Sequence, residues 1–476
     1  MIESGRGLVL SGERRLDGAT LADHAARAAT GFESLGVRRG DTVAVILRNE
    51  PAFFEATLGA QHVGAYCVPM NWHNTVDETR YILVDSGARA VVIHADLYAT
   101  LHEAVPHGVP VVVVETPPEI RTAYALDAAA CKVPAACTAW SEWLGKHLPR
   151  SAPPIAAPDV MLYTSGTTGR PKGVRRAAPN VDQVGVQDEV RAISFGFPRG
   201  GGSSVTVVVT GPMYHSAPNA FGLIAAREGA TVVLQPRFDA AELLALIERH
   251  RVTHLQMVPV MFNRLLALPR AQREAHDLSS LRFVVHAAAP IAPDAKRRMI
   301  DWWGPIIHEY YGCTGQPGRV ACRVRGMPDF TYHNDDEKRA RVEAGSLVLT
   351  GDIGYLDEDG FLYLCDRASD MVISGGVNIY PAEIEVALGR LPGVADCAVF
   401  GIPDAEFGEA VHAVVQPVAG TRLDEAAVRL HLRPLLAGYK LPRSIEFRTE
   451  LPREDSGKLF KRRLRDPWWS GTGRSI

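Results

Sequence analysis

Residues 160–173 read VMLYTSGTTGRPKG, and this stretch decides the fold class of the chain. The apolar residues 160–162 predict a strand, which leads into a loop rich in glycine and hydroxyl side chains. Glycines let backbone N–H groups approach an anion, hydroxyls donate to phosphate oxygens, and a lysine adds a point charge. The GxxxxGK[ST] spacing of a Walker loop is absent. We therefore predict a phosphate-binding loop that uses Thr164, Ser165, Gly166, Thr167, Thr168, Gly169 and Lys172.

Short β-branched runs alternate with helical patterns around this loop. Helices are expected at 51–63 and 239–250, the second with Asp239 as its N-cap and with Leu243, Leu244 and Ile247 on one face. Such alternation predicts a layered α/β fold with largely parallel sheets. The expected strands are 42–47, 90–94, 111–115, 204–210, 231–234, 254–258 and 282–286.

The sequence changes character after residue 320, where turn residues become dense. Short strands are expected at 345–349 and 360–365, followed by a charged junction, DRASD, at 366–370. Beyond the junction the pattern is that of a small α+β unit, with strands at 395–400 and 411–416 and a helix at 424–433. We expect a large domain over 1–366 and a small domain over 367–476.

Composition narrows the classes of function. The chain has 476 residues, 46% of them hydrophobic, which is enough for more than one core. Its net charge of −3 argues against a protein that binds nucleic acid. No apolar run approaches the ~18 residues of a membrane span, and the N-terminus lacks the apolar stretch of a secretory signal. Seven cysteines without a CxxC pair favour free thiols in a reducing cytoplasm.

The phosphate loop resembles the signature of the adenylate-forming (ANL) superfamily, in its acyl-CoA synthetase or carboxylate–CoA ligase branch. Seven further stretches resemble the superfamily's motifs in its order, and they cover nearly the whole chain. The resemblance implies a large N-terminal domain with two mostly parallel sheets and a small β subdomain, and a mobile α+β C-terminal domain that turns about 366–370. The stretches are 213–217, 286–290, 310–314, 350–354, 366–370, 374–385 and 451–458.

Enzymes of the superfamily catalyse two half-reactions. A carboxylate first attacks the α-phosphate of ATP, and the thiol of CoA then attacks the acyl-adenylate. By resemblance, the catalytic residues would be Lys458, His215 and Thr314, with His215 between the acyl pocket and the thiol tunnel. The implied nucleotide contacts are Ala287, Ala288, Tyr311, Gly312, Asp352 and Arg367. The implied hinge and CoA-tunnel residues are Ser369, Ser374, Gly375 and Gly376.

Two departures from the superfamily stand together. Its adenine motif normally ends in Thr-Glu, where the glutamate binds Mg²⁺, but Gly315 follows Thr314 here. The stretch between Thr314 and Thr350 is also too short for the strands the superfamily fits there. The shortened region resembles that of an acyl-CoA synthetase subgroup of platensimycin and platencin biosynthesis, which would imply a bulky terpenoid acid as substrate.

These departures damage the step that uses ATP and Mg²⁺, while the residues that would hold an acyl-adenylate and offer it to CoA remain. We therefore hypothesise a thioester-forming enzyme with weak or absent adenylation, supplied with acyl-adenylate by a separate enzyme. One alternative is a complete ligase that uses ATP and Mg²⁺, with another metal ligand such as Gln316, Asp329, Asp335 or Asp336. The others are a non-catalytic AMP- or CoA-binding module, and acyl transfer to a carrier protein instead of CoA.

Overall fold

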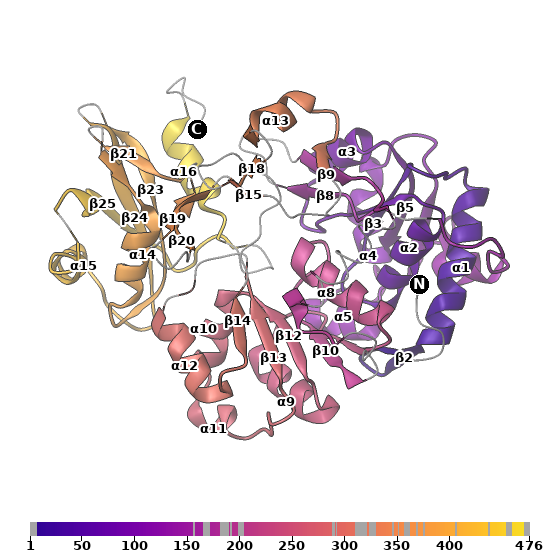
Figure 1. Ribbon diagram of the computed structural model, residues 1–476, viewed down its shortest axis with the longest axis horizontal. Helices are drawn as coiled ribbons and strands as arrows, with labels where there is room; N and C mark the ends of the chain where they lie inside the picture. The colour runs from indigo at the N-terminus through magenta and orange to yellow at the C-terminus, as the bar shows by residue number, and fades with distance from the viewer. Residues whose placement is uncertain are drawn as a thin grey trace.

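The architecture is that of a layered α/β protein, seen in a computed structural model (Figure 1). Two large sheets occupy the N-terminal part, and a third sheet forms the C-terminal part at the opposite end of the long axis. The described residues are 7–155, 158–164, 172–180, 190, 193–198, 204–287, 291, 293–309, 321–322, 330–344, 347–350, 352–356, 362–367, 370–374, 377–404, 407–436, 438–453 and 459–470.

The first large sheet has seven strands in the order β14-β13-β12-β10-β11-β1-β2, all parallel except the hairpin partner β2. Strands β10, β11 and β13 coincide with β-branched runs of the sequence, which suit a sheet covered on both faces. The strands are β1 (Leu8–Ser11), β2 (Arg14–Asp17), β10 (Thr206–Val209), β11 (Thr231–Leu234), β12 (His254–Met257), β13 (Phe283–His286) and β14 (Ile307–Glu309).

The second large sheet is entirely parallel, in the order β4-β3-β5-β6-β7. The chain reverses its direction of strand addition between β3 and β5, so these two strands define the switch point of the sheet. The strands are β3 (Thr42–Ile46), β4 (Tyr66–Pro69), β5 (Ala88–His94), β6 (Val111–Val114) and β7 (Thr138–Ala139).

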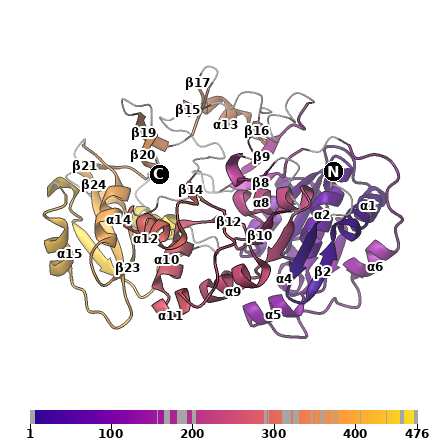
Figure 2. The same cartoon turned by 60° about the horizontal axis from the view of Figure 1, so that its bottom comes forward.

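One hydrophobic core joins the two sheets. Val43 and Val45 of β3 share it with Val207 and Val209 of β10, while Val208 turns to the opposite face, as the two-residue period of a strand requires. Helices α1 (Gly18–Ser34), α2 (Pro51–His62) and α8 (Ser216–Arg227) contribute to this shared core (Figure 2). The outer faces are covered by α3 (Val76–Asp85) and α4 (Ala95–Leu101), and by α9 (Ala240–His250), α10 (Pro259–Ala267) and α12 (Pro293–Trp303).

The α1–α2 contact inside this core depends on a glycine. A Cβ atom at Gly59 of α2 would lie 2.6 Å from Cβ of Ala28 on α1. Only glycine permits this approach, and the backbone of α2 at Gly59 therefore packs directly against the Ala28 side chain of α1. Short helices complete the region: α5 (Pro118–Tyr124), α6 (Trp140–Gly145), α11 (Arg270–Arg273) and η1 (His102–Ala104).

Small antiparallel sheets are formed by two strands that precede β10 in the chain and by strands that lie between β14 and the C-terminal sheet. They are β16-β9-β8, β15-β18-β17 and β19-β20, and α13 (Asp336–Arg341) accompanies them. Their strands are β8 (Leu162–Thr164), β9 (Lys172–Arg176), β15 (Ala321–Cys322), β16 (Phe330–Tyr332), β17 (Glu343–Ala344), β18 (Leu347–Leu349), β19 (Asp352–Leu356) and β20 (Leu362–Arg367).

The C-terminal sheet has five strands, with β22-β21-β24-β23 in order and β25 beside β24. One face packs on α14 (Pro381–Gly389) and α15 (Glu425–Leu432), and the other on α16 (Lys461–Trp469). The strands are β21 (Val372–Ser374), β22 (Val377–Ile379), β23 (Val394–Asp404), β24 (Gly408–Pro417) and β25 (Ser444–Phe447), and η3 (Gly438–Lys440) precedes β25.

The α/β class, the large N-terminal domain, the small C-terminal domain and the mostly parallel sheets are confirmed. The boundary at residue 366 stays a prediction. Asp239 is the N-cap of α9, since its side chain accepts from the Glu242 N–H, and Leu243, Leu244 and Ile247 are buried. No helix among the described residues is long and apolar enough to cross a membrane.

Candidate active site

The phosphate loop begins and ends on an antiparallel hairpin. Strand β8 enters it and β9 leaves it, with Thr164 opposite Lys172. Tyr163 of β8 donates its hydroxyl to Asp85 Oδ2 at 2.7 Å, and burial together with this carboxylate raises the pKa of the phenol. A Cβ at Gly173 would overlap the side chains of Met161 and Tyr163, which explains that glycine. The base of the loop is therefore a packed element.

Strand β16 adds a third strand to this hairpin, a pairing that the sequence did not predict. Tyr332 lies opposite Val174, and the next residue, His333, donates its N–H to the Gly173 carbonyl at 2.9 Å. Because β16 runs antiparallel to β9, the chain leaves β16 at the end of the hairpin that carries the phosphate loop. Asp335 and Asp336 follow directly, with Asp336 opening α13.

His215 stands at the start of α8, directly after the loop that leaves β10. The ring centroid of Tyr214 is 4.3 Å from that of His215 and 4.7 Å from that of Trp72. Asn219, in the first turn of α8, donates to the Met213 carbonyl at 2.7 Å. The predicted 213–217 motif thus begins with the buried residues Met213 and Tyr214 and continues into the half-buried His215 and the exposed Ser216.

Ala287 follows β13, and β14 ends at Glu309 directly before 310–314. Strands β10, β13 and β14 are parallel members of one sheet, so His215, Ala287 and Glu309, the last described residue before 310–314, share its carboxyl edge. Ligands bind at such edges in open α/β sheets. The described residues of the 213–217 and 286–290 motifs therefore lie at one sheet edge, although they are far apart in sequence.

His286, just before Ala287, is fully buried, and neither ring nitrogen has a hydrogen-bond partner among the described residues. Burial lowers its pKa to about 4, against the attraction of Glu309, whose Oε2 lies 3.7 Å from Nε2. Lys296 of α12 holds the same Glu309 oxygen at 2.6 Å. The position directly before the predicted adenine turn is thus an uncharged imidazole at neutral pH.

The two residues implied for the ribose lie opposite each other. Asp352 begins β19 and Arg367 ends β20, and their Cα atoms are register partners across this antiparallel pair. Asp352 is buried, and its N–H donates to the hydroxyl of the buried Thr350 at 3.2 Å. This pairing brings together a carboxylate and an arginine position that the sequence separates by fifteen residues, counting from 352 to 367.

In the C-terminal sheet, Ser374 ends β21 and pairs both with Val377 of β22 and with Gly408 of β24.

The chain on either side of Lys458 is also fixed. Arg453 forms a bidentate ion pair with Asp396, with 2.7 Å from Nη2 to Oδ1 and 2.7 Å from Nε to Oδ2. Its backbone also forms an isolated antiparallel β-bridge with Leu459. The segment that carries Lys458 therefore starts and ends on a fixed base.

Several predicted site residues lie outside the described part of the chain, and their roles stay predictions. For Thr164, Lys172 and Arg367 the structure describes the backbone alone. Those outside it are Ser165, Gly166, Thr167, Thr168, Gly169, Ala288, Tyr311, Gly312, Thr314, Gly315, Ser369, Gly375, Gly376 and Lys458.

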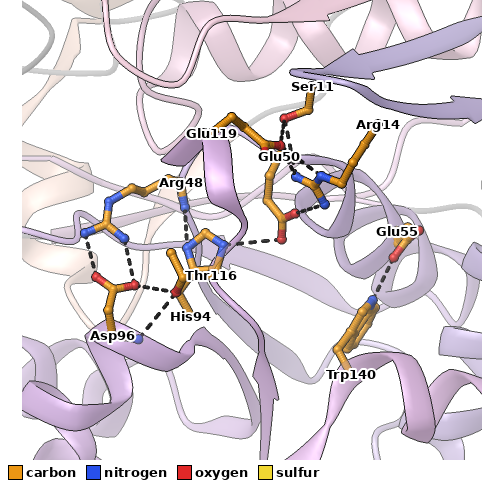
Figure 3. A network of polar contacts seen from close by, with 10 residues as sticks. All are labelled: Ser11, Arg14, Arg48, Glu50, Glu55, His94, Asp96, Thr116, Glu119 and Trp140. Carbon is orange, nitrogen blue, oxygen red and sulfur yellow. Dashed lines mark hydrogen bonds and ion pairs between the residues drawn. The ribbon is translucent and has the colours of Figure 1, made fainter. Parts of the chain in front are cut away.

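A buried polar network, missed by the sequence analysis, fills the carboxyl edge of the second sheet at its switch point (Figure 3). Arg48 pairs with Asp96 through two contacts, 3.0 Å and 2.9 Å long. Glu50, 1% exposed, lies 3.3 Å from His94 Nε2 and 3.0 Å from Arg14 Nη1. Polar residues directly after buried strands are a sequence signal that could have located this edge.

The hydrogen bonds of the network fix the His94 tautomer. The Arg48 N–H donates to His94 Nδ1 at 3.2 Å, so Nε2 carries the ring hydrogen and donates to Glu50. Burial alone would raise the pKa of Glu50, but His94 and Arg14 outweigh it and hold this pKa below its ordinary range. Glu119 also holds Arg14, at 2.6 Å. The charged groups at this edge are thus paired with one another, while Arg48 Nε has no hydrogen-bond partner among the described residues.

The fold defines the class of protein: its arrangement matches that of adenylate-forming enzymes. The anthranilate CoA ligase AuaEII, solved with anthranoyl-AMP, superposes with a TM-score of 0.81 at 23% identity, covering 98% of this chain and 94% of that one. The family model of the AMP-binding enzymes matches residues 5–362, and the model of the AMP-binding enzyme C-terminal domain matches residues 383–458.

Two curated relatives agree. A feruloyl-CoA synthase of Amycolatopsis sp is 33% identical over 504 aligned positions, covering 96% of this chain and 95% of the relative. A 3-[(3aS,4S,7aS)-7a-methyl-1,5-dioxo-octahydro-1H-inden-4-yl]propanoyl:CoA ligase of Mycobacterium tuberculosis is 33% identical over 520, with the same coverages. The chain belongs to the AMP-binding enzyme family, in its acyl-CoA synthetase and ligase branch.

Proposed function

We propose that the chain forms an acyl-CoA thioester from an acyl-adenylate and CoA, and that it adenylates the free acid weakly or not at all. A separate enzyme would then supply the adenylate of a small carboxylic acid. The observation that carries this proposal is Gly315, which stands directly after Thr314 where the superfamily motif has a metal-binding glutamate.

The chemistry of the donor set supports this proposal. Mg²⁺ in nucleotide sites is held by one or two carboxylates plus phosphate oxygens, and a glycine side chain offers no oxygen. Lewis-acid stabilisation of this kind is worth several kcal/mol, and each ~1.4 kcal/mol is a factor of ten in rate.

The length of the chain also supports the proposal. The alignment with the feruloyl-CoA synthase spans 504 positions, whereas the chain has 476 residues, so at least 28 positions (504 − 476) face no residue of this chain. We infer that part of this shortfall lies after Gly315, where the sequence is shorter than the superfamily pattern. Strands lost there would border the phosphates of ATP.

The proposed reaction needs only groups of the adenylate and of CoA. The thiol sulfur attacks the acyl carbonyl carbon, the bond from that carbon to the phosphate oxygen breaks, and AMP leaves with both electrons of that bond. The thiol proton passes to solvent. Asp352 and Arg367 would hold the ribose of the AMP moiety, Ser374 would border the thiol's path, and His215 would stand beside the acyl carbon.

The proposed organisation follows the same resemblance. A large domain over 1–366 would hold the adenylate, and a small domain over 367–476 would turn about 366–370 between steps. We propose the cytoplasm as the compartment, in keeping with the free thiols of Cys67, Cys131, Cys137 and Cys397.

A second candidate, a complete ATP-dependent ligase, is favoured by one observation. The β16–β9 pairing carries Asp335 and Asp336 to the end of the hairpin that bears the phosphate loop. Carboxylates there could replace the missing glutamate. This candidate predicts that ATP and free acid support thioester formation, and that loss of both aspartates abolishes it.

A paired assay separates the two candidates. One series contains the protein, CoA and chemically made acyl-adenylates, and a matched series contains the protein, CoA, ATP, Mg²⁺ and the free acids. Acyl-CoA is detected by mass spectrometry. Thioester from the adenylates alone supports the proposal, whereas thioester from ATP and acid at a comparable rate contradicts it and establishes a full ligase.

A further inference from the structure

We propose that Asn49 is a positioning residue for thioester formation, because it fixes the loop that presents His215. The inference rests on the proposed function and on the role proposed there for His215. Asn49 follows strand β3 of the second sheet, whereas the loop 210–215 follows strand β10 of the first. The residue thus joins the carboxyl edges of the two large sheets at the predicted acyl site.

The Asn49 side chain is 2% exposed, and its hydrogen bonds to protein end on backbone groups of the first sheet. Nδ2 donates to the Gly211 carbonyl at 2.9 Å and to the Gln235 carbonyl at 3.4 Å. Oδ1 accepts from the Met213 N–H at 2.9 Å. Carbonyls can only accept and an N–H can only donate, so the orientation of the amide is determined.

The loop is also held from its other side. Asn219, itself 1% exposed, donates to the Met213 carbonyl, and its own N–H donates to the His215 carbonyl at 3.1 Å. Both peptide groups of Met213 are therefore bonded to buried asparagines, one from each side. His215 is two residues beyond this fixed point, so its backbone position follows from the two amides.

The buried charge network explains why Asn49 can act as a fixed support. Its neighbours in sequence, Arg48 and Glu50, are both anchored: Arg48 by the bidentate contact with Asp96, and Glu50 by Arg14 and His94 (Figure 3). The backbone at position 49 is therefore held on both sides by buried charges. Side-chain groups held in this way give a site the precision that orientation of reactants requires.

The test uses thioester formation from a supplied acyl-adenylate. Asn49→Ala removes all three hydrogen bonds, and Asn49→Asp keeps the acceptor for Met213 but sets a carboxylate against two carbonyls. Misplacement of a reacting group by about 1 Å can cost about 100-fold in rate, so we expect kcat to fall about 10- to 100-fold. The KM for CoA is expected to stay within about threefold, since no described contact joins Asn49 to Ser374 of the predicted CoA tunnel.

Glu55→Gln is the matched control. Glu55 of α2 is 6% exposed and accepts a 2.7 Å bond from Trp140 Nε1, yet no described contact joins it to the 210–215 loop. This variant is expected to lower the melting temperature with kcat unchanged. A kcat loss in Glu55→Gln equal to that in the Asn49 variants would overturn the inference, because general loosening would then explain both.

A double-mutant cycle gives a readout that a merely structural role would not move. In a His215→Ala background, Asn49→Ala is expected to lower kcat less than threefold further, because the group it positions is gone. Independent, multiplying effects would overturn the inference. The wild-type protein distinguishes failure of the inference from failure of the proposed function. If the wild type forms thioester and the Asn49 variants form it equally fast, the inference alone is refuted. If the wild type forms no thioester from any adenylate, the proposed function is refuted and the inference with it.

Discussion

The substitution Glu50→Gln tests the buried network that supports the candidate site. Gln keeps the size of the side chain and an oxygen that can accept from His94 Nε2, but it removes the charge that faces Arg14 at 3.0 Å. A hydrogen bond to a charged group contributes about 1.5–3 kcal/mol. Arg14 is 40% exposed and keeps Glu119 at 2.6 Å, so its guanidinium is not left unpaired. We therefore expect the lower part of that range, about 1.5–2 kcal/mol.

Hydrogen exchange followed by mass spectrometry measures this loss locally, which matters because a chain of several domains does not unfold in one step. A loss of 1.5–2 kcal/mol corresponds to roughly 10- to 30-fold faster exchange of the most protected amides in β3 and β5, with each 1.4 kcal/mol a factor of ten. Amides of β23 and β24 in the C-terminal sheet serve as the internal control and should not change.

The pH dependence has a defined sign. The pKa of Glu50 is lowered in the folded protein, so its contribution is complete above the unfolded value of about 4.3 and is lost as pH falls through the folded value. The stability gap between wild type and Glu50→Gln should thus be constant down to about pH 5 and close below pH 4.3. Unchanged exchange at neutral pH, or a gap that widens in acid, would refute this account of the network.

Three further predictions concern the core, a buried histidine and the second candidate function. Gly59→Ala should lower stability by about 1–3 kcal/mol, because its Cβ would lie 2.6 Å from Cβ of Ala28, whereas Gly145→Ala, with no atom within 4 Å, should change a urea midpoint little. The pKa of His286 is lowered to about 4, so the folded protein loses stability as pH falls from the unfolded pKa of about 6.5 towards 4. Urea unfolding of His286→Leu should show a smaller loss of stability over this pH range. The same pH dependence of stability in the variant and the wild type would contradict the lowered pKa of His286. The double variant Asp335→Asn, Asp336→Asn should form thioester from a supplied adenylate within about threefold of the wild-type rate. If the variant instead loses all thioester formation from ATP and free acid, measured by mass spectrometry, the full ligase is favoured.

Local signals in the sequence were sufficient for the central strands. The β-branched run at 231–234 corresponds to β11 residue for residue, as expected for a buried parallel strand, and the predicted strand at 254–258 contains β12. The N-cap at Asp239 was equally readable, since a single side chain satisfies the exposed N–H groups of the first turn.

Pairings between distant segments could not be read in the same way. Nothing in residues 8–17 indicates that β1 joins β11, or in 330–332 that β16 joins β9, because both depend on the completed sheet. Asn49 lies between the predicted strand 42–47 and the predicted helix 51–63, and its three hydrogen bonds to backbone groups exist only after two sheets meet. Asp352 and Arg367 were implied by the family resemblance, and their register pairing is what the structure adds.

Exchange of labelled pyrophosphate into ATP tests the central claim most directly, because it reports adenylation alone and needs no CoA. The protein is incubated with ATP, Mg²⁺, labelled pyrophosphate and a panel of carboxylic acids that includes the acid whose adenylate yields thioester. We predict exchange at the background level with every acid, under conditions where the supplied adenylate is converted to acyl-CoA. Acid-dependent exchange at a rate comparable to thioester formation would contradict the account and show that the chain adenylates its own substrate despite Gly315.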